Sequence, residues 1–190
     1  MLASSAEAQR LLPGRFGAAV YGGISYPTGT FGDEAKLGWH GGAYLEADLY
    51  AAIDLRLDGI FTKFGTKEIS DEDNTAELSS EAFIFTLAAE LNMGADSAAY
   101  PGDNTISPWI IAGPGIYRFD FEGVCTRGTC GGVDVSSAAE THWGLNFGGG
   151  ATVPFGGLRF LVEGRYHIVF PKRDQTGNLT MLLLSAGIKF

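Results

Sequence analysis

Leu179-Thr180-Met181-Leu182-Leu183-Leu184-Ser185-Ala186-Gly187-Ile188-Lys189-Phe190, the C-terminal stretch, ends on an aromatic residue and is apolar at every second position before it. Because successive side chains of a β-strand point to opposite faces, Phe190 and these alternating residues share one face. A membrane barrel shows such a face to lipid and closes by pairing its last strand with its first. The stretch therefore predicts the closing strand of a transmembrane β-barrel.

The composition favours one all-β domain. The chain has 190 residues, 28 of them glycine, with 45% hydrophobic and only 18% charged residues, and glycine is useful where a sheet curves. No apolar run approaches the roughly 18 residues that a spanning helix needs. A mean hydropathy of +0.08 suits a chain whose apolar residues alternate with polar ones. The net charge of −9 argues against a nucleic-acid partner, which would require clustered Lys and Arg.

Seven further segments alternate in the same way, at residues 15–26, 39–50, 54–64, 82–93, 108–120, 142–153 and 158–170. With the last strand they make eight, an even number as in single-chain outer-membrane barrels. In segment 108–120 we expect Trp109 and Tyr117 to face outward and Arg118 and Asp120 inward, with a bulge at Pro114, which cannot donate to a ladder. The predicted fold is an all-β, eight-stranded antiparallel up-and-down transmembrane β-barrel.

A soluble barrel of lipocalin type, or a β-sandwich, is the alternative, since its strands also have one apolar face. Such a protein fills its interior with bulky apolar residues. Here the bulky row faces away from a row of small and charged residues, which favours the membrane barrel. We expect residues 14–190 to form it and residues 1–13 to be an N-terminal tail or signal-peptide remnant, because Ala6-Glu7-Ala8 resembles a signal cleavage site.

The connections alternate in length. Those at Tyr50–Ile53 and Pro154–Gly157 are short, and the long polar ones fall at 27–37, 65–80, 121–139 and 171–178. Barrels with periplasmic termini have short periplasmic turns and long outer loops, so this parity predicts both termini in the periplasm. The segment Gly94–Ser107 departs from the pattern as a long periplasmic turn.

The inward rows predict a closed, charge-balanced lumen, because an eight-stranded interior is just wide enough for its side chains and buried charges need partners. Six carboxylates are expected to face six cations, and no catalytic residue, metal or cofactor is expected. The predicted network consists of Arg15, Glu46, Asp48, Arg56, Asp58, Glu90, Arg118, Asp120, Arg159, Glu163, Arg165 and Lys189. A second interpretation of the same groups is the binding of a small polar solute or the passage of protons.

Three other groups of residues suggest local chemistry. Cys125 and Cys130 lie close together in a polar loop without neighbours that would complete a zinc site, which favours a disulfide over free thiols or metal and implies an oxidising compartment. The run 71–74 could bind Ca²⁺ or join lipopolysaccharide through divalent ions, but it lacks the spacing of a calcium loop. His142, with Glu140 and Ser136 and Ser137 nearby, is the nearest approach to a catalytic triad.

The chain resembles the small outer-membrane β-barrels that include the OmpA transmembrane domain and OmpX. The resemblance lies in Pro108–Arg118, Gly144–Gly150, Glu163–Tyr166 and Ser185–Phe190. It implies location in the bacterial outer membrane among lipids and lipopolysaccharide, and recognition of Phe190 by the barrel-assembly machinery. It implies no catalytic residue. We expect a monomer that supports the envelope or makes surface contacts through its outer loops; a narrow, OmpW-like channel for small solutes is the alternative, and a lipid-modifying enzyme a remote one.

Overall fold

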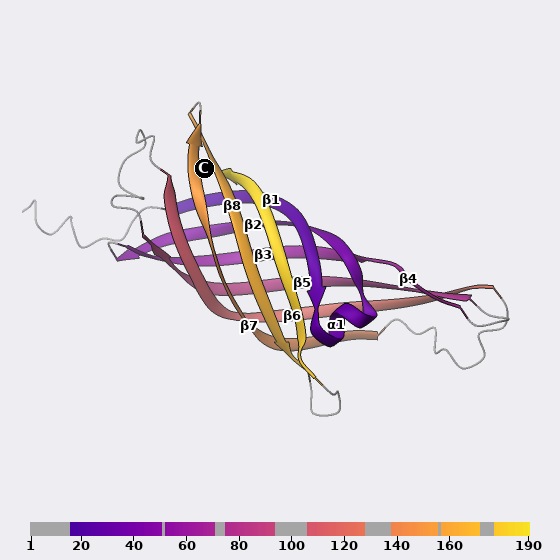
Figure 1. Ribbon diagram of the computed structural model, residues 1–190. Coiled ribbons are helices and arrows are strands. Elements are labelled where there is room, and N and C mark those ends of the chain that lie inside the picture. Colours follow the sequence, from indigo (N-terminus) through magenta and orange to yellow (C-terminus); the bar gives the residue numbers. More distant parts are fainter. Residues whose placement is uncertain are drawn as a thin grey trace, which may run out of the picture.

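The computed structural model describes residues 16–50, 52–70, 75–93, 106–127, 138–155, 157–171 and 177–190. Their elements are strands, with one six-residue helix (Figure 1). The bounds are β1 Phe16–Thr28, α1 Gly29–Glu34, β2 Lys36–Tyr50, β3 Ile53–Gly65, β4 Lys67–Ser70, β5 Thr75–Asn92, β6 Ser107–Arg127, β7 Ala138–Phe155, β8 Leu158–Phe170 and β9 Leu179–Lys189. No helix in these ranges is long and apolar enough to cross a membrane.

The strands form a closed antiparallel barrel. Strands that follow one another in sequence pair, except β3 with β4, and β1 pairs with β9 to complete the ring. β3 and β4 are separated only by Thr66 and both pair with β5, so together they act as one strand. The predicted eight-stranded up-and-down barrel is therefore confirmed.

The first and last strands of the barrel meet at the seam. Val20 pairs with Ile188, and the backbone N–H of Phe190 donates to the carbonyl of Ala18 over 2.8 Å. We call this end of the barrel, with the short connections around residues 52 and 157, the turn end. The opposite end, with α1, the end of β6 at Arg127 and the start of β9 at Leu179, is the loop end (Figure 1).

The predicted facing of one strand is wrong. In β6, Trp109 and Tyr117 are 2% and 0% exposed and point into the lumen, while Ile110 and Ile116 lie on the outer wall. Arg118 and Asp120 therefore point outward, with side chains 59% and 41% exposed and an ion pair of 3.7 Å between them. Both rows of this strand are apolar in its first half, so alternation alone could not distinguish them, and the larger aromatic rings fill the lumen instead of facing lipid.

Pro114 also differs from expectation. It interrupts the β5–β6 pairing between Thr86–Gly115 and Ala89–Ala112, but the register is the same on both sides, so there is no bulge. Proline has no N–H to donate, so the β5–β6 ladder loses its hydrogen bonds around Pro114. The Pro114 ring lies on the outer wall. The neighbouring carbonyl of Gly113 accepts a hydrogen bond from Asn146 Nδ2 at 2.8 Å.

The outer wall carries an apolar band. Large apolar side chains such as Leu45, Leu57, Phe85 and Phe147 are about half exposed. Trp39 and Tyr50, at opposite ends of β2, are 54% and 78% exposed. Eleven residues at about 3.3 Å each, tilted by about 40°, separate them by about 28 Å along the barrel axis, close to the roughly 25 Å of an outer-membrane apolar band.

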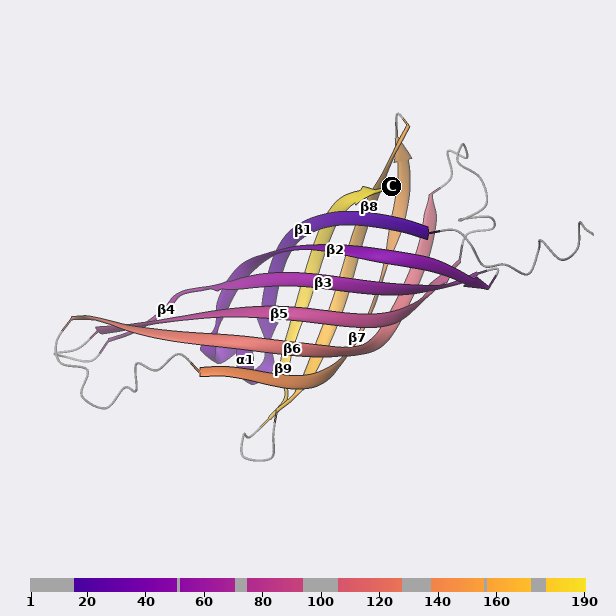
Figure 2. The ribbon, with the colours of Figure 1, turned by 180° about the vertical axis from the view of Figure 1, so that it is seen from behind.

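Part of the wall extends beyond the barrel at the loop end. β6 pairs with β7 as far as Phe121–Ala138, but continues to Arg127 while paired with β5. β4 lies on the other side of β5. We call this three-stranded extension, β4 with the loop-end parts of β5 and β6, the outer ribbon; it projects from the barrel in both views (Figures 1 and 2).

Inward-facing glycines of β7 make room for the aromatic rings of β6. A Cβ placed on Gly144 would lie 2.7 Å from Cε2 of Tyr117, and one on Gly150 would lie 2.5 Å from Cζ2 of Trp109. These distances are shorter than carbon atoms tolerate, so each ring occupies the volume that a side chain on β7 would take. The glycine-rich row of β7 and the aromatic row of β6 are thus complementary.

Gly144→Ala is expected to destabilise the barrel by about 1–3 kcal/mol, because overpacking forces the Tyr117 ring and the adjacent backbone to move. Gly164→Ala is the matched control, since its Cβ would point outward and meet Leu184 at an ordinary 3.5 Å. Urea unfolding in detergent micelles, followed by circular dichroism, measures both. Equal stability of the two variants would contradict this account of the packing.

Candidate functional site

Arg56 is the centre of the lumen. Its side chain is fully buried, and its guanidinium contacts three carboxylates from three strands: Asp58 of β3 at 2.8 Å, Glu163 of β8 at 2.7 Å and Glu90 of β5 at 3.3 Å. The guanidinium carbon also lies 3.6 Å from the centre of the Tyr44 ring, a cation–π distance. β3 and β8 lie on opposite walls of the barrel (Figure 2), so the contact of Arg56 with Glu163 links the two walls.

Asp58 is the matching anion. It accepts hydrogen bonds from Arg56, from Arg165 Nη1 at 3.2 Å, from the Tyr21 hydroxyl at 2.9 Å and from Thr86 at 3.2 Å. Arg165 also donates to Glu163 through Nη2 at 3.2 Å. Arg56, Asp58, Glu163 and Arg165 each have at least two charged partners, as a buried ion network requires, whereas Glu90 has Arg56 alone among the described residues.

The charge balance differs from the predicted six against six. Arg118 and Asp120 leave the lumen, and Asp54, which is 4% exposed on β3, joins it. The buried charged groups of the described residues are five carboxylates and two cations: Glu46, Asp54, Asp58, Glu90 and Glu163 against Arg56 and Arg165. The half-buried Lys189 adds a third cation through its ion pair with Glu46. Asp54 lies on the same face of β3 as Arg56 and Asp58, so the alternation of that strand could have identified it.

The remaining predicted residues lie near the turn end or outside the described ranges. Lys189 Nζ is 2.6 Å from Oε1 of Glu46, and Asp48 and Arg159 are half-buried. Phe190 is 72% exposed, and its role in assembly stays a prediction. Arg15, Cys130, the tail 1–13, the acidic run 71–74 and most of the turn Gly94–Ser107 lie outside the described residues, so the disulfide of Cys125 also stays a prediction.

A neutral polar layer lies above the central cluster, toward the loop end. His40 is hydrogen-bonded to Ser25 at 3.1 Å and to Ser185 at 2.8 Å, and Thr62 donates to Ser25 at 2.7 Å. His167 is hydrogen-bonded to the Tyr117 hydroxyl at 2.9 Å. Both histidines are buried within the lumen, and their hydrogen-bond partners lie on other strands, so the sequence alone does not show them.

The loop end of the lumen is closed by an apolar plug that the sequence did not reveal. The segment predicted as a loop at 27–37 contains α1, and its Phe31 is 1% exposed. The ring of Phe31 packs edge-on against Phe64 and Phe119, with centroids 5.0 and 5.8 Å away. Phe31 belongs to the same buried cluster as Met181 and Leu183. The interior is therefore partly a hydrophobic core and not only a row of small and charged residues.

His142 forms a pair with Glu140, from Nε2 to Oε2 at 3.1 Å. His142 is 3% exposed, and its Nδ1 has no hydrogen-bond partner among the described residues. A hydrolase triad needs a hydroxyl on the imidazole nitrogen opposite the acid. Ser136 and Ser137, the hydroxyls noted in the sequence, lie outside the described ranges. The described residues therefore supply the imidazole and the acid of a triad but not its hydroxyl.

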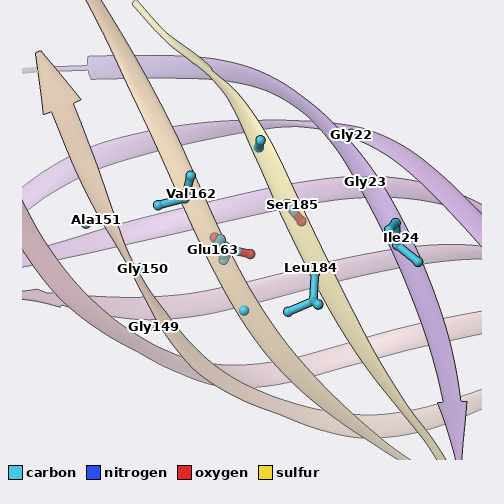
Figure 3. Close-up of a pocket in the computed structure, with 12 residues that line it drawn as sticks. Gly22, Gly23, Ile24, Gly149, Gly150, Ala151, Val162, Glu163, Leu184 and Ser185 are labelled. Atoms are coloured by element: carbon cyan, nitrogen blue, oxygen red, sulfur yellow. The ribbon is translucent and has the colours of Figure 1, made fainter. Parts of the chain in front are cut away.

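The outer wall is hollowed where β1, β9, β8 and β7 run side by side (Figure 3). Outward-facing small residues form the floor of this depression, and Ile24, Leu184 and Val162 stand around it. The floor is apolar and lies within the lipid-facing band. It consists of Gly22, Gly149, Ala151, Gly164 and Ala186.

Comparison with solved structures identifies the class of fold. The chain is similar to Neisserial surface protein A (TM-score 0.57, 15% identity, 92% of this chain and 95% of that chain). It is also similar to Ail of Yersinia pestis, solved with the heparin analogue sucrose octasulfate (0.51, 12%, 93% and 99%). The outer membrane enzyme PagL gives 0.51 at 15% identity over 93% and 99%.

These structures are small eight-stranded outer-membrane barrels, and the chain has their fold. No protein-family model matches the sequence, and a search of curated proteins gives no significant match. At 12–15% identity the likeness concerns architecture alone.

Arg56→Met is expected to destabilise the barrel by about 3–5 kcal/mol, because it leaves Asp58, Glu90 and Glu163 buried with less compensation. Arg118→Met is the matched control, because it makes the same substitution at an exposed arginine. The exposed ion pair between Arg118 and Asp120 should contribute less than about 1 kcal/mol. Unfolding midpoints in detergent micelles measure the difference. A similar, small loss in both variants would show that the network does not stabilise the fold.

Proposed function

We propose that the protein is an outer-membrane barrel that supports the envelope and acts through its loop-end surface, with a lumen closed to solutes. The observation that carries this proposal is the filling of the lumen along its whole length. From the turn end to the loop end, Trp109, Arg56, Arg165, Tyr117 and Phe31 are each at most 2% exposed.

Location in the membrane is supported by the wall itself. A soluble protein rarely exposes contiguous apolar patches larger than a few hundred Å². Here an apolar band surrounds the barrel and extends along its axis from the position of Trp39 to that of Tyr50. The closed ring leaves the barrel strands without a free edge in lipid. The similar structures are outer-membrane proteins, and we infer the same location for this chain, with the loop end outside.

The outer ribbon is the part of the described structure best suited to surface contact. Beyond Phe121, β6 has β5 on one side only, and β4 pairs with β5 alone among the described residues. Such strand edges offer unpaired N–H and C=O groups to a partner. Residues 65–80 contain five carboxylates and one lysine, so the expected partner is neutral or cationic. A sulfated ligand such as the one solved with Ail would be repelled by these carboxylates and is not the partner that we propose.

Planar-bilayer recording tests the closed lumen. The full chain, purified and refolded in detergent, is expected to give no stable unit openings, because conduction would require displacement of the Arg56 network and of the Phe31 plug.

A variant with residues 67–78 replaced by a Gly-Ser turn should still fold and insert, because the outer ribbon lies beyond the barrel wall. Heat-modifiable migration on gels reports folding of both.

Reproducible unit openings of the wild type, altered in size by Glu163→Gln, would overturn the proposal in favour of a narrow channel. Failure of the ribbon variant to fold would instead show that the ribbon is structural. Release of lipid A acyl chains by the purified protein, with loss of this activity in His142→Ala, would favour a lipid-modifying enzyme. Within the described residues, the His142–Glu140 pair is the observation that points to that function.

A further inference from the structure

We propose that Glu46, Asp54 and Glu90 bind a divalent cation at the turn end of the lumen. The three carboxylates come from the adjacent strands β2, β3 and β5, and each is at most 6% exposed. One oxygen from each lies within 4.8 Å of the others. This is a distance that a single cation can bridge, since carboxylate oxygens bind Ca²⁺ at 2.3–2.6 Å.

The register of the sheet brings Asp54 and Glu90 together. Asp54 is directly opposite Glu90 on β5 and directly opposite the half-buried Asp48 on β2. Glu46 lies two residues before Asp48 on the same inward face of β2 and completes the cluster. Like charges in directly opposed positions destabilise a sheet. Positive charge relieves this repulsion; among the described residues Lys189 pairs with Glu46 and Arg56 with Glu90, whereas Asp54 forms no ion pair.

The protein donors leave oxygens free for that charge. Lys189 contacts Oε1 of Glu46 at 2.6 Å, and Oε2 of Glu46 is buried without a hydrogen-bond partner among the described residues. Arg56 contacts Oε2 of Glu90 at 3.3 Å, and Oε1 of Glu90 likewise has no partner within the described ranges. Asp54 accepts from Asn92 Nδ2 through Oδ2 at 2.7 Å. Buried acceptors without a partner are costly, and in this case two such oxygens belong to the same cluster.

The charge count is an independent argument. Five buried carboxylates against the buried Arg56 and Arg165 and the half-buried Lys189 leave two negative charges when all of these groups are ionised. Adding the half-buried Asp48 and Arg159 adds one charge of each sign and does not change the difference. A divalent cation would neutralise it.

The chemistry of the cluster selects the class of ion. The free groups are carboxylate oxygens, without imidazole or thiolate among the clustered residues, and oxygen ligands suit Ca²⁺ and Mg²⁺ rather than zinc or copper. Three protein oxygens would leave positions for water. Bound there, the ion would join the turn ends of β2, β3 and β5.

Calorimetric titration of the full chain tests the proposal. The protein is purified in detergent, stripped with EDTA, dialysed and titrated with CaCl₂ or MgCl₂ at neutral pH. We expect saturable binding of one ion per chain, and a higher midpoint of thermal unfolding in Ca²⁺ than in EDTA. Glu90→Gln and Asp54→Asn should each weaken binding at least tenfold.

Two features separate the site from its alternatives. A variant with Asp71→Asn, Glu72→Gln and Asp73→Asn should bind like the wild type; loss of binding there would place the ion in that loop and overturn the proposal. In EDTA, Asp54→Asn should be at least as stable as the wild type, because it removes like-charge repulsion, so loss of binding would not reflect misfolding. Absence of saturable binding by the folded wild type would also overturn the proposal.

Discussion

The contacts of the Arg56 guanidinium are the interactions on which the rest of the structure depends. A barrel of eight strands has an interior just wide enough for side chains, and the lipid-facing wall forces polar side chains into it. Arg56 lies in that space with Asp58, Glu90 and Glu163 around it and Tyr44 against its face. The N–H groups of this one guanidinium thus bind carboxylates of β3, β5 and β8 and connect these three strands across the lumen.

The other layers of the lumen are arranged around this centre. Toward the loop end, neutral hydrogen bonds of His40 and His167 lead to the apolar plug of Phe31, Phe64 and Phe119. Toward the turn end, the acids Glu46 and Asp54 gather. Polarity therefore changes along the axis, from a carboxylate-rich end to a hydrophobic one. This sequence of layers explains why the proposed function lies at the surface and not in transport.

Alternation identified the barrel, because seven of the strand segments place bulky apolar side chains on one face and small or charged ones on the other. It was wrong for β6, where Trp109 and Ile110 are both apolar and only packing against Gly150 of β7 decides which faces inward. It could not reveal α1, because six residues with one phenylalanine look like any loop. The partners of Arg56 depend on strand register and on contacts across the lumen, which a single sequence does not contain.

The facing of β6 is the most direct test of this account, since it determines which rings fill the lumen and which charges leave it. The chain has three tryptophans, of which Trp39 and Trp143 lie on the outer wall and Trp109 lies in the lumen. Single-tryptophan variants in bilayers of brominated lipid measure contact with acyl chains by fluorescence quenching. The account predicts strong quenching of Trp143 and Trp39 and little quenching of Trp109. Quenching of Trp109 as strong as that of Trp143 would contradict it.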